Sequence, residues 1–466
     1  MPDRDNLDSW LDGRVDPLPP PPGTFELIKR RARRRKYRKL AVTAGAAAVI
    51  VAAAVTVPQV VNLHVLSPAP ASSNLAGRVP TATTPTGVGT PASNSASPVP
   101  SSTLPPGVPA NFRPTSVTFV SIGKGWVIGQ AGPPCATQFC TSVARTDNAG
   151  KTWTGVPAPL TGPPDGAAGV SQIRFLNGDD GWAFGPELFA THDGGQTWKQ
   201  VATNGLRVTD VETVGDRAFG LFASCSGTGP AFAGQCTSFT LYSSPAAADD
   251  WTPVGPSTSG LTNDRQDGSA AIVLTGTRGY LLAPNRMLYA GPVDGPVGGP
   301  VGGPVGGTAP WQQVAPIPCV VGAAQPDGQP AGALLGAESA TNLIFACTPP
   351  PVLGGLQKKM ILTSANGGAS WQELAVAPAA GIATSLAASP AEAVVLGTNQ
   401  GIDVLPTGSA NWQQATVKDA PATGFAFVGM TTGAQGVAVP ADATAGTIWF
   451  TFDGGQTWAP STVASP

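Results

Sequence analysis

The sequence predicts an all-β fold, a seven-bladed β-propeller of four-stranded blades, preceded by one transmembrane helix and a disordered linker. Three observations predict it. A short motif ending in Trp recurs along most of the chain, an apolar strand-like phrase precedes each copy, and the first quarter divides into a basic, an apolar and a Pro/Ser/Thr-rich segment. We therefore divide the chain into residues 1–39, 40–63, 64–114 and 115–466.

Residues 1–39 form a basic tail that we expect in the cytoplasm. They hold 11 of the 26 Lys and Arg residues, nine of them between Lys29 and Lys39. A basic cluster that precedes an apolar span keeps its end of the chain in the cytoplasm. Such clusters usually fix topology and contact anionic headgroups. Alternatively the tail, which carries Trp10 among acidic residues, binds a cytoplasmic regulator and makes the protein a signal transducer.

Residues 40–63 form the predicted transmembrane helix. The run from Leu40 to Val57 carries no charge and continues apolar beyond Pro58, and a membrane span needs about 20 such residues. The long basic preface favours a retained signal anchor over a cleaved signal peptide ending at Ala69–Ala71. We therefore expect a single-pass protein of the plasma membrane, with a cytoplasmic N-terminus and an extracytoplasmic propeller.

Residues 64–114 form the predicted linker. The segment is dominated by Pro, Ser, Thr, Ala, Gly and Val, and its charged residues are Arg78 and Arg113. Because it contains little to bury, we expect it to stay extended and solvated.

An eight-residue motif, Ser/Thr-x-Asp/Asn-x-Gly-x-Ser/Thr-Trp, recurs in the rest of the chain and is called the turn motif below. Degenerate copies, which keep only part of the motif, end at Trp251, Trp311 and Trp412. Successive Trp residues of the seven copies lie 41 to 60 positions apart. One gap of 60 contains a 17-residue Gly-Pro-Val-Gly-Gly tract, 291–307. This period is that of a propeller blade. The four clear copies are Thr146–Trp153, Thr191–Trp198, Ser364–Trp371 and Thr451–Trp458.

Each unit also contains a short apolar segment, typical of a β-strand, ahead of its turn motif, as in Gly125–Gly129 and Gly181–Gly185. Apolar runs with turn residues between them indicate four short strands per unit. No strand is left over, so we expect the ring to close by packing of the first blade against the last, without strand exchange.

The turn motif has a structural role in this interpretation. The Asp or Asn accepts backbone N–H bonds in a tight turn between the last two strands, the Gly adopts a positive φ, and the Trp packs back on the blade. The predicted structural residues are Asn148, Gly150, Trp153, Asp193, Gly195, Trp198, Asn366, Gly368, Trp371, Asp453, Gly455 and Trp458.

With these residues, the region resembles the Asp-box (BNR-repeat) propeller superfamily, which includes sialidases, sortilin-type receptors and photosystem-assembly-factor-like propellers. The resemblance implies that the box lies on the outer rim, away from the central channel, so its carboxylates are structural. The tail resembles those of actinobacterial single-pass membrane proteins. A shared fold does not imply a shared function.

The resemblance also raises a sialidase-type glycoside hydrolase as an alternative, which implies three arginines, a Tyr-Glu pair and an Asp acid/base. No residue stands in a recognisable catalytic context, and we expect no catalytic, cofactor-binding or metal-binding residue. His64 and His192 are too few for a multi-His metal site, and a net charge of −2 does not fit a nucleic-acid binder. The candidates for the alternative are Arg145, Arg174, Arg207, Arg217, Arg265, Arg278, Arg286, Glu187, Glu212, Glu338, Glu373, Glu392, Tyr242, Tyr280 and Tyr289.

The six cysteines form three near neighbours, each within one repeat unit. An even number of cysteines outside the cytoplasm indicates disulfides, and six cysteines allow 15 connectivities, among which proximity in sequence favours local pairing. The predicted pairs are Cys135–Cys140, Cys225–Cys236 and Cys319–Cys347.

We expect a membrane-anchored extracytoplasmic propeller that acts as a non-enzymatic recognition or scaffold module at the cell envelope. A propeller presents a rigid face of loops, so the expected partner is a protein or a cell-wall glycan. The hydrolase and the signal transducer remain alternatives. The sequence implies no cofactor and leaves the oligomeric state open.

Overall fold

The computed structural model describes residues 108–130, 141–162, 169–226, 235–259, 270–283, 287–293, 311–316, 318–319, 332–349, 355–389, 393–406, 408–442 and 446–464. All of them belong to one compact unit, Ala92–Pro466. The predicted tail, span and most of the predicted linker lie outside them. Within these ranges no helix is long and apolar enough to cross a membrane.

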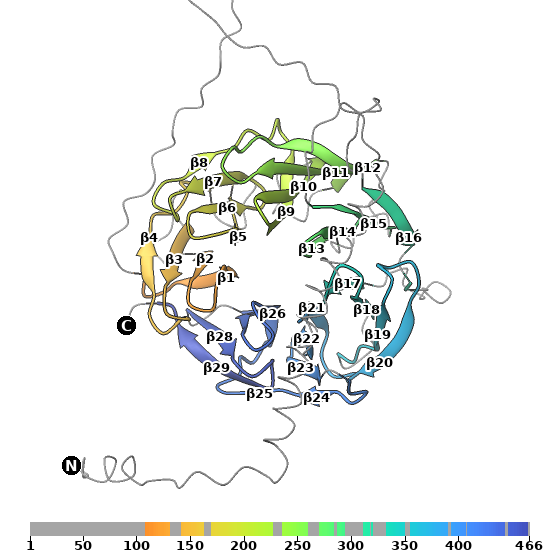
Figure 1. Ribbon diagram of the computed structural model, residues 1–466. Helices are drawn as coiled ribbons and strands as arrows, with labels where there is room; N and C mark the ends of the chain where they lie inside the picture. Colours follow the sequence, from red (N-terminus) through yellow and green to blue (C-terminus); the bar gives the residue numbers. More distant parts are fainter. Residues whose placement is uncertain are drawn as a thin grey trace, which may run out of the picture. The chain divides into compact units, whose positions relative to one another are not determined.

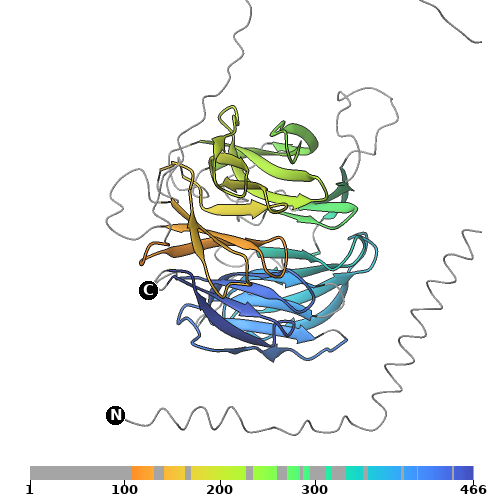
Figure 2. The ribbon, with the colours of Figure 1, turned by 60° about the vertical axis from the view of Figure 1, so that its left-hand side comes forward.

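The described residues form seven antiparallel sheets, the blades, which follow one another in chain order around a common centre (Figures 1 and 2). The first strand of each blade is innermost, and from blade 1 through to blade 7 it contacts the first strand of the following blade. Blades 1 to 3 comprise β1 (Arg113–Phe119), β2 (Gly125–Gln130), β3 (Thr141–Thr146), β4 (Thr154–Val156), β5 (Gln172–Phe175), β6 (Asp180–Phe184), β7 (Leu188–His192), β8 (Lys199–Gln200), β9 (Arg207–Val214), β10 (Arg217–Ser226), β11 (Gln235–Pro245) and β12 (Thr252–Ser259).

Blades 4 to 7 have the same topology. They comprise β13 (Ala271–Leu274), β14 (Arg278–Leu282), β15 (Met287–Pro292), β16 (Gln312–Pro316), β17 (Gly332–Ala337), β18 (Leu343–Thr348), β19 (Lys359–Ser364), β20 (Gln372–Ala377), β21 (Ala383–Ala388), β22 (Ala393–Thr398), β23 (Gly401–Pro406), β24 (Gln413–Gln414), β26 (Phe425–Met430), β27 (Gly436–Pro440), β28 (Thr447–Thr451) and β29 (Thr457–Thr462). Each of the seven predicted Trp residues stands just before or within the outermost strand of its blade.

The predicted seven-bladed propeller with four-stranded blades is thus confirmed. One strand was not predicted. The short strand β25 (Thr416–Val417), in the connection from blade 6 to blade 7, pairs in parallel with β29 and makes the last sheet five-stranded. The connection therefore ties blade 6 to the outer edge of blade 7 by backbone hydrogen bonds.

The core is divided among the interfaces between neighbouring blades, which we call seams. Seven buried hydrophobic clusters are present in the described residues, and each draws its members from two neighbouring blades. A strand whose two faces are both covered is apolar along almost its whole length. In β18 and β22, for example, every residue is buried. Each blade therefore needs both neighbours to bury its faces.

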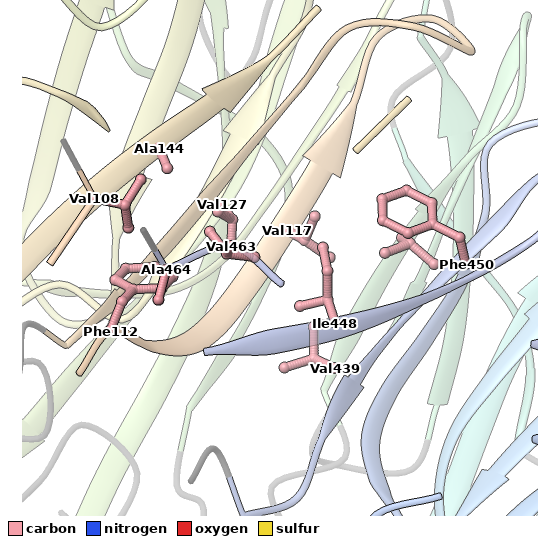
Figure 3. Packing of buried hydrophobic residues seen from close by; sticks show 11 residues of the cluster. Val108, Phe112, Val117, Val127, Ala144, Val439, Ile448, Phe450, Val463 and Ala464 are labelled. Carbon is pink, nitrogen blue, oxygen red and sulfur yellow. The ribbon is translucent and has the colours of Figure 1, made fainter. Parts of the chain in front are cut away.

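The ring closes at the seam between blades 7 and 1, without strand exchange (Figure 3). Val117 and Val127 of blade 1 share a buried cluster with Ile448 and Phe450 of blade 7. The segment before β1 joins this cluster through Phe112. Packing of the first blade on the last is therefore the closure device.

The turn motif lies between the third and fourth strands of blades 1, 2, 5 and 7. In each copy the Asp or Asn Oδ1 accepts the backbone N–H four residues on, as Asp193 does from Thr197 at 2.8 Å. The hydroxyl of the second Ser or Thr in the motif donates a hydrogen bond where the motif contains Asp and accepts one where it contains Asn. Thr197 Oγ1 donates to Asp193 Oδ2, whereas Asn148 Nδ2 donates to Thr152 Oγ1.

The Gly of the turn motifs in blades 1, 5 and 7 also lies unusually close to the preceding blade, which the sequence did not reveal. Gly150 has φ of 78°, and a Cβ placed on it would lie 2.5 Å from the ring of Phe450 in the preceding blade. The equivalent Cβ on Gly368 would lie 2.4 Å from Leu288, and on Gly455 it would lie 2.9 Å from Val395. The absent side chain is thus required for the turn and for close approach of the preceding blade.

Two of the three predicted disulfides are confirmed. Cys225–Cys236 joins β10 to β11, and Cys319–Cys347 joins the segment before β17 to β18. The third predicted pair, Cys135–Cys140, lies outside the described residues. Each observed disulfide closes a local loop, 11 and 28 residues long in sequence separation.

A fully buried lysine holds the connection between blades 5 and 6. Lys359 in β19 has no exposed side-chain surface, and its ammonium donates to four backbone carbonyls. Burial lowers the pKa of Lys359, and the charge of Asp403 in β23 opposes that shift. The accepting carbonyls are those of Gln357, Pro378, Ala380 and Gly381.

The Gly150→Ala variant tests the seam contact of the turn motif, with Gly205→Ala as its control. Both glycines have φ near 80°, but nothing lies within 4 Å of a Cβ on Gly205. Both variants should lose about 1–2 kcal/mol through left-handed strain, and Gly150→Ala a further 1–3 kcal/mol through overpacking. Urea unfolding measures the difference, and equal losses would contradict the contact.

The Lys359→Met variant tests the four carbonyls around the Lys359 ammonium, which we call the carbonyl cage. Lys358→Met is the control because Lys358 is exposed. Removing the ammonium leaves buried carbonyls unsatisfied, so we expect a loss of about 3 kcal/mol in the free energy of unfolding. The surface control should change it by less than about 0.5 kcal/mol. A cage variant as stable as the control would show that water replaces the ammonium.

Candidate functional site

A cavity of about 370 Å³ lies at the centre of the ring, lined by the innermost strands of all seven blades. The lining positions fall in the C-terminal half of each innermost strand. Because the third strand of a blade runs parallel to the first, the turn motifs lie at the same end of the propeller. No turn-motif residue lines the cavity.

The cavity is lined mostly by apolar residue types, although polar atoms make up more of its exposed surface than apolar ones. Aliphatic, aromatic and glycine residues form most of the lining, and its charged members are Arg174 of β5 and Glu212 of β9, which we call the polar corner. The other polar side chains of the lining are Thr118, Thr213 and Thr431. A concave site with a few placed polar side chains is a candidate ligand site.

Arg174 and Glu212 form an ion pair, the channel pair, across the seam between blades 2 and 3. Arg174 Nε and Nη2 donate to Glu212 Oε1 at 2.9 and 2.7 Å, and Nη1 donates to the carbonyl of Ile173. Arg174 alternates with the buried Ile173 and Phe175 along β5. Burial would lower the pKa of Arg174, but Glu212 raises it, so the guanidinium stays charged.

Asp210 lies behind the channel pair, two residues before Glu212 on the same strand. Side chains two apart on a strand share a face, so the two carboxyls are neighbours. Asp210 Oδ2 accepts the backbone N–H of Ile272 in blade 4 at 2.8 Å. Burial, and then the charge of Glu212, raises the pKa of Asp210 to about 7. Below about pH 7 the site therefore combines a protonated carboxyl with an ion-paired one.

The bond from Ile272 to Asp210 belongs to a wider pattern. The inner edge of each first strand has no neighbouring strand, and unpaired edge groups need other partners. Ser116 and Thr118 accept the N–H groups of Ile173 and Phe175 in the next blade. Asp210 thus also accepts a hydrogen bond from an otherwise unpaired backbone N–H, that of Ile272, at the edge of β13.

His192 forms a second cluster outside the cavity, with Asp180 and Asp249. We call these three residues the rim clasp. His192 Nδ1 lies 2.8 Å from Asp180 Oδ1, and Nε2 lies 3.0 Å from Asp249 Oδ2 in blade 3. Burial would lower the pKa of His192, but its hydrogen bonds to both carboxylates raise it above the ordinary value. The sequence analysis considered His192 only as a possible metal ligand and did not predict these partners.

The structure brings one of the candidate arginines and one of the candidate glutamates into the cavity. Arg145 pairs with Asp147, Arg217 donates to Ser243, and Arg278 lies over the ring of Tyr280. No three arginines meet in the described lining. Arg207, Glu187, Glu338, Glu373, Tyr242 and Tyr289 are absent from that lining, and Arg265, Arg286 and Glu392 lie outside the described residues.

Asp210 was missed by the sequence analysis, although an Asp-x-Glu pair within an apolar strand could have indicated it. No group of three or more His, Cys, Asp or Glu side chains suited to a metal occurs in the part of the chain that the structure describes.

Comparisons with known proteins give distant structural likenesses. No protein-family model matches the chain, and no curated protein does. A structure of YCF48 bound to D1 peptide is 15% identical over 74% of this chain and 95% of that chain, with a TM-score of 0.46. Streptogramin B lyase is 10% identical over 74% and 91%, with a TM-score of 0.43.

The GH74 enzyme of Niastella koreensis is 11% identical, with a TM-score of 0.35, and the match covers 74% of this chain and 65% of that one. Similarity this distant carries no argument about function. The fold assignment therefore rests on the strand order and registers of this chain.

The Asp210→Asn variant tests the titrating carboxyl. Because the folded protein retains this proton up to about pH 7 and the unfolded chain loses it near pH 4, stability should fall as pH rises between these values. The Asn variant keeps an acceptor for Ile272 and should lose that slope, whereas the exposed Asp147→Asn control should keep it. Thermal unfolding from pH 4 to 8 measures the slopes, and equal slopes would refute the assignment.

Proposed function

We propose that the protein is a membrane-anchored extracytoplasmic propeller that acts as a non-enzymatic recognition or scaffold module at the cell envelope, with the central cavity as its ligand site. The observation that carries the proposal is the cavity itself, which strands from all seven blades line and which contains one polar corner, Arg174 and Glu212. Its volume of about 370 Å³ falls within the usual range of ligand pockets, ~300–1,000 Å³.

The cysteines support the extracytoplasmic assignment. Disulfides persist in oxidising compartments and are rare in the cytosol, and this propeller contains Cys225–Cys236 and Cys319–Cys347. The basic run ending at Lys39 and the uncharged run that follows support an anchor with a cytoplasmic N-terminus. The resemblance of the turn motifs to Asp-boxes fits a recognition propeller.

The polar corner indicates the chemistry of the ligand. Arg174 offers hydrogen-bond donors and Glu212 offers acceptors, on opposite sides of one seam. Peptide amides and sugar hydroxyls both donate and accept, so a peptide segment or a cell-wall glycan matches the corner while its apolar parts contact the walls.

A glycoside hydrolase is the second candidate, and the carboxyl pair favours it. Such enzymes use a pair of carboxyls, one of which donates a proton, and Asp210, with its raised pKa, lies beside the carboxyl of Glu212. Against it, Arg174 is the one arginine in the described lining, whereas the sialidase resemblance implies three.

Equilibrium binding to the full-length protein in lipid nanodiscs tests the proposal. The probes are fluorescently labelled muropeptides, chito-oligosaccharides and extended hexapeptides. We expect saturable binding of one probe class, weakened at least tenfold by Glu212→Gln, because the acceptor loses its charge, and unchanged by the rim control Asp147→Asn. The probe should be recovered intact.

Two results would overturn the proposal. Cleavage of a glycan probe that is abolished by Asp210→Asn would establish the hydrolase. Binding of every probe class that is equal in Glu212→Gln and in the wild-type protein would show that the cavity is not the ligand site.

A further inference from the structure

Among the described residues, the seam between blades 2 and 3 is bridged by charged side chains at two places, one at the rim and one at the channel. The rim clasp joins His192 of blade 2 to Asp249 of blade 3, and the channel pair joins Arg174 to Glu212. Both bridges lie toward the end of the propeller where the first strands finish. Between them lies a buried cluster that includes Trp182 and Phe222.

The rim clasp requires a doubly protonated imidazole. Both ring nitrogens of His192 face a carboxylate oxygen at hydrogen-bond distance, 2.8 and 3.0 Å. A neutral imidazole has one N–H, so either tautomer leaves a ring lone pair facing an oxygen of Asp180 or Asp249. The geometry is therefore satisfied only by the cation.

The groups that face His192 come from two blades. Asp180 stands at the start of β6 and also accepts from Asn177. Asp249 lies in the turn between β11 and β12, has a positive φ of 49°, and also accepts from Trp182 Nε1 at 3.3 Å. The turn that carries Asp249 is thus held on blade 2 by His192 and Trp182, and loss of the imidazolium removes its ion pair with His192.

The channel side also contains a group that titrates near neutral pH. Asp210 faces Glu212 on its own strand, Arg174 on β5, and the N–H of Ile272 on β13. When Asp210 loses its proton, a second negative charge appears beside Glu212 on blade 3, and the two carboxylates repel each other. The polar corner then contains one cation and two anions in place of one cation and one anion.

We propose that the seam between blades 2 and 3 is a pH-sensitive switch, closed at acid pH and loosened as the pH rises through neutrality. Closed, both bridges hold the blades together at the end where the cavity lies. Loosened, the turn at Asp249 separates from His192 and the polar corner of the cavity rearranges. The buried cluster of Trp182 and Phe222 remains, so the change is local and the ring stays folded.

The seam between blades 6 and 7 provides an internal control. There Thr384 donates to the carbonyl of Phe425, and Ser385 bonds both the N–H and the carbonyl of Val428. Hydroxyls do not titrate in the physiological range, so this inner-strand contact should not respond to pH.

Hydrogen exchange of the full-length protein between pH 5.5 and 8.5 tests the switch, with rates corrected for the intrinsic pH dependence of exchange. We expect protection of peptides covering 245–252 and 207–214 to fall about tenfold as the pH rises, while 383–388 and 425–430 stay constant. His192→Gln should give low protection of 245–252 at every pH, and Asp210→Asn should flatten the profile of 207–214.

Two outcomes would overturn the proposal. One is a pH profile of 245–252 that matches the control seam, and the other is a wild-type profile in His192→Gln. NMR titration of the His192 ring provides a measurement that needs no variant. A midpoint at or below that of an exposed His would also refute the switch.

Discussion

A blade of this protein is apolar on both faces, and that constraint governs the rest of the structure. Each of the seven buried clusters belongs to two blades at once, so no blade has a core of its own. Burial of apolar surface stabilises by about 25 cal/mol per Å², and only a closed ring gives every blade two covered faces. The seam between blades 7 and 1 is therefore as necessary as the other six.

The fold was predictable because packing between neighbouring blades requires particular residue types at short, recurring sequence positions. Trp153, Trp371 and Trp458 stand where the outermost strand begins, and the glycine three residues before each combines a positive φ with close approach of the preceding blade. The positive φ and the close approach are both requirements on a glycine, and this glycine recurs at the spacing of the blades. Strand β25 escaped prediction because two residues in a connection carry no periodic signal, and its pairing is set by the neighbouring blade.

The site was less predictable, since its contacts join residues that are distant in sequence. Arg174 and Glu212 were among the candidates by residue type, but nothing near either one shows that they meet across a seam. Asp210 gains its raised pKa from burial and from a neighbouring carboxylate, and His192 gains partners 12 and 57 residues away. Packing of the blades creates these environments, so they became visible only with the ring assembled.

The inner ends of the seams connect fold to function. First strands present unpaired edges to the channel, and hydroxyls or carboxyls from neighbouring blades cap some of these groups. One of these caps, Asp210, lies next to the channel pair of Arg174 and Glu212, so an edge-capping carboxyl and the polar corner of the cavity occur together.

Methyl NOEs across the closing seam test the account most directly. Val117 and Ile448 share one buried cluster although they stand at opposite ends of the propeller sequence (Figure 3). The account predicts strong NOEs between their methyl groups in the full-length protein. Absence of these NOEs, with both methyls assigned and the flanking strands folded, would contradict a closed ring of seven blades.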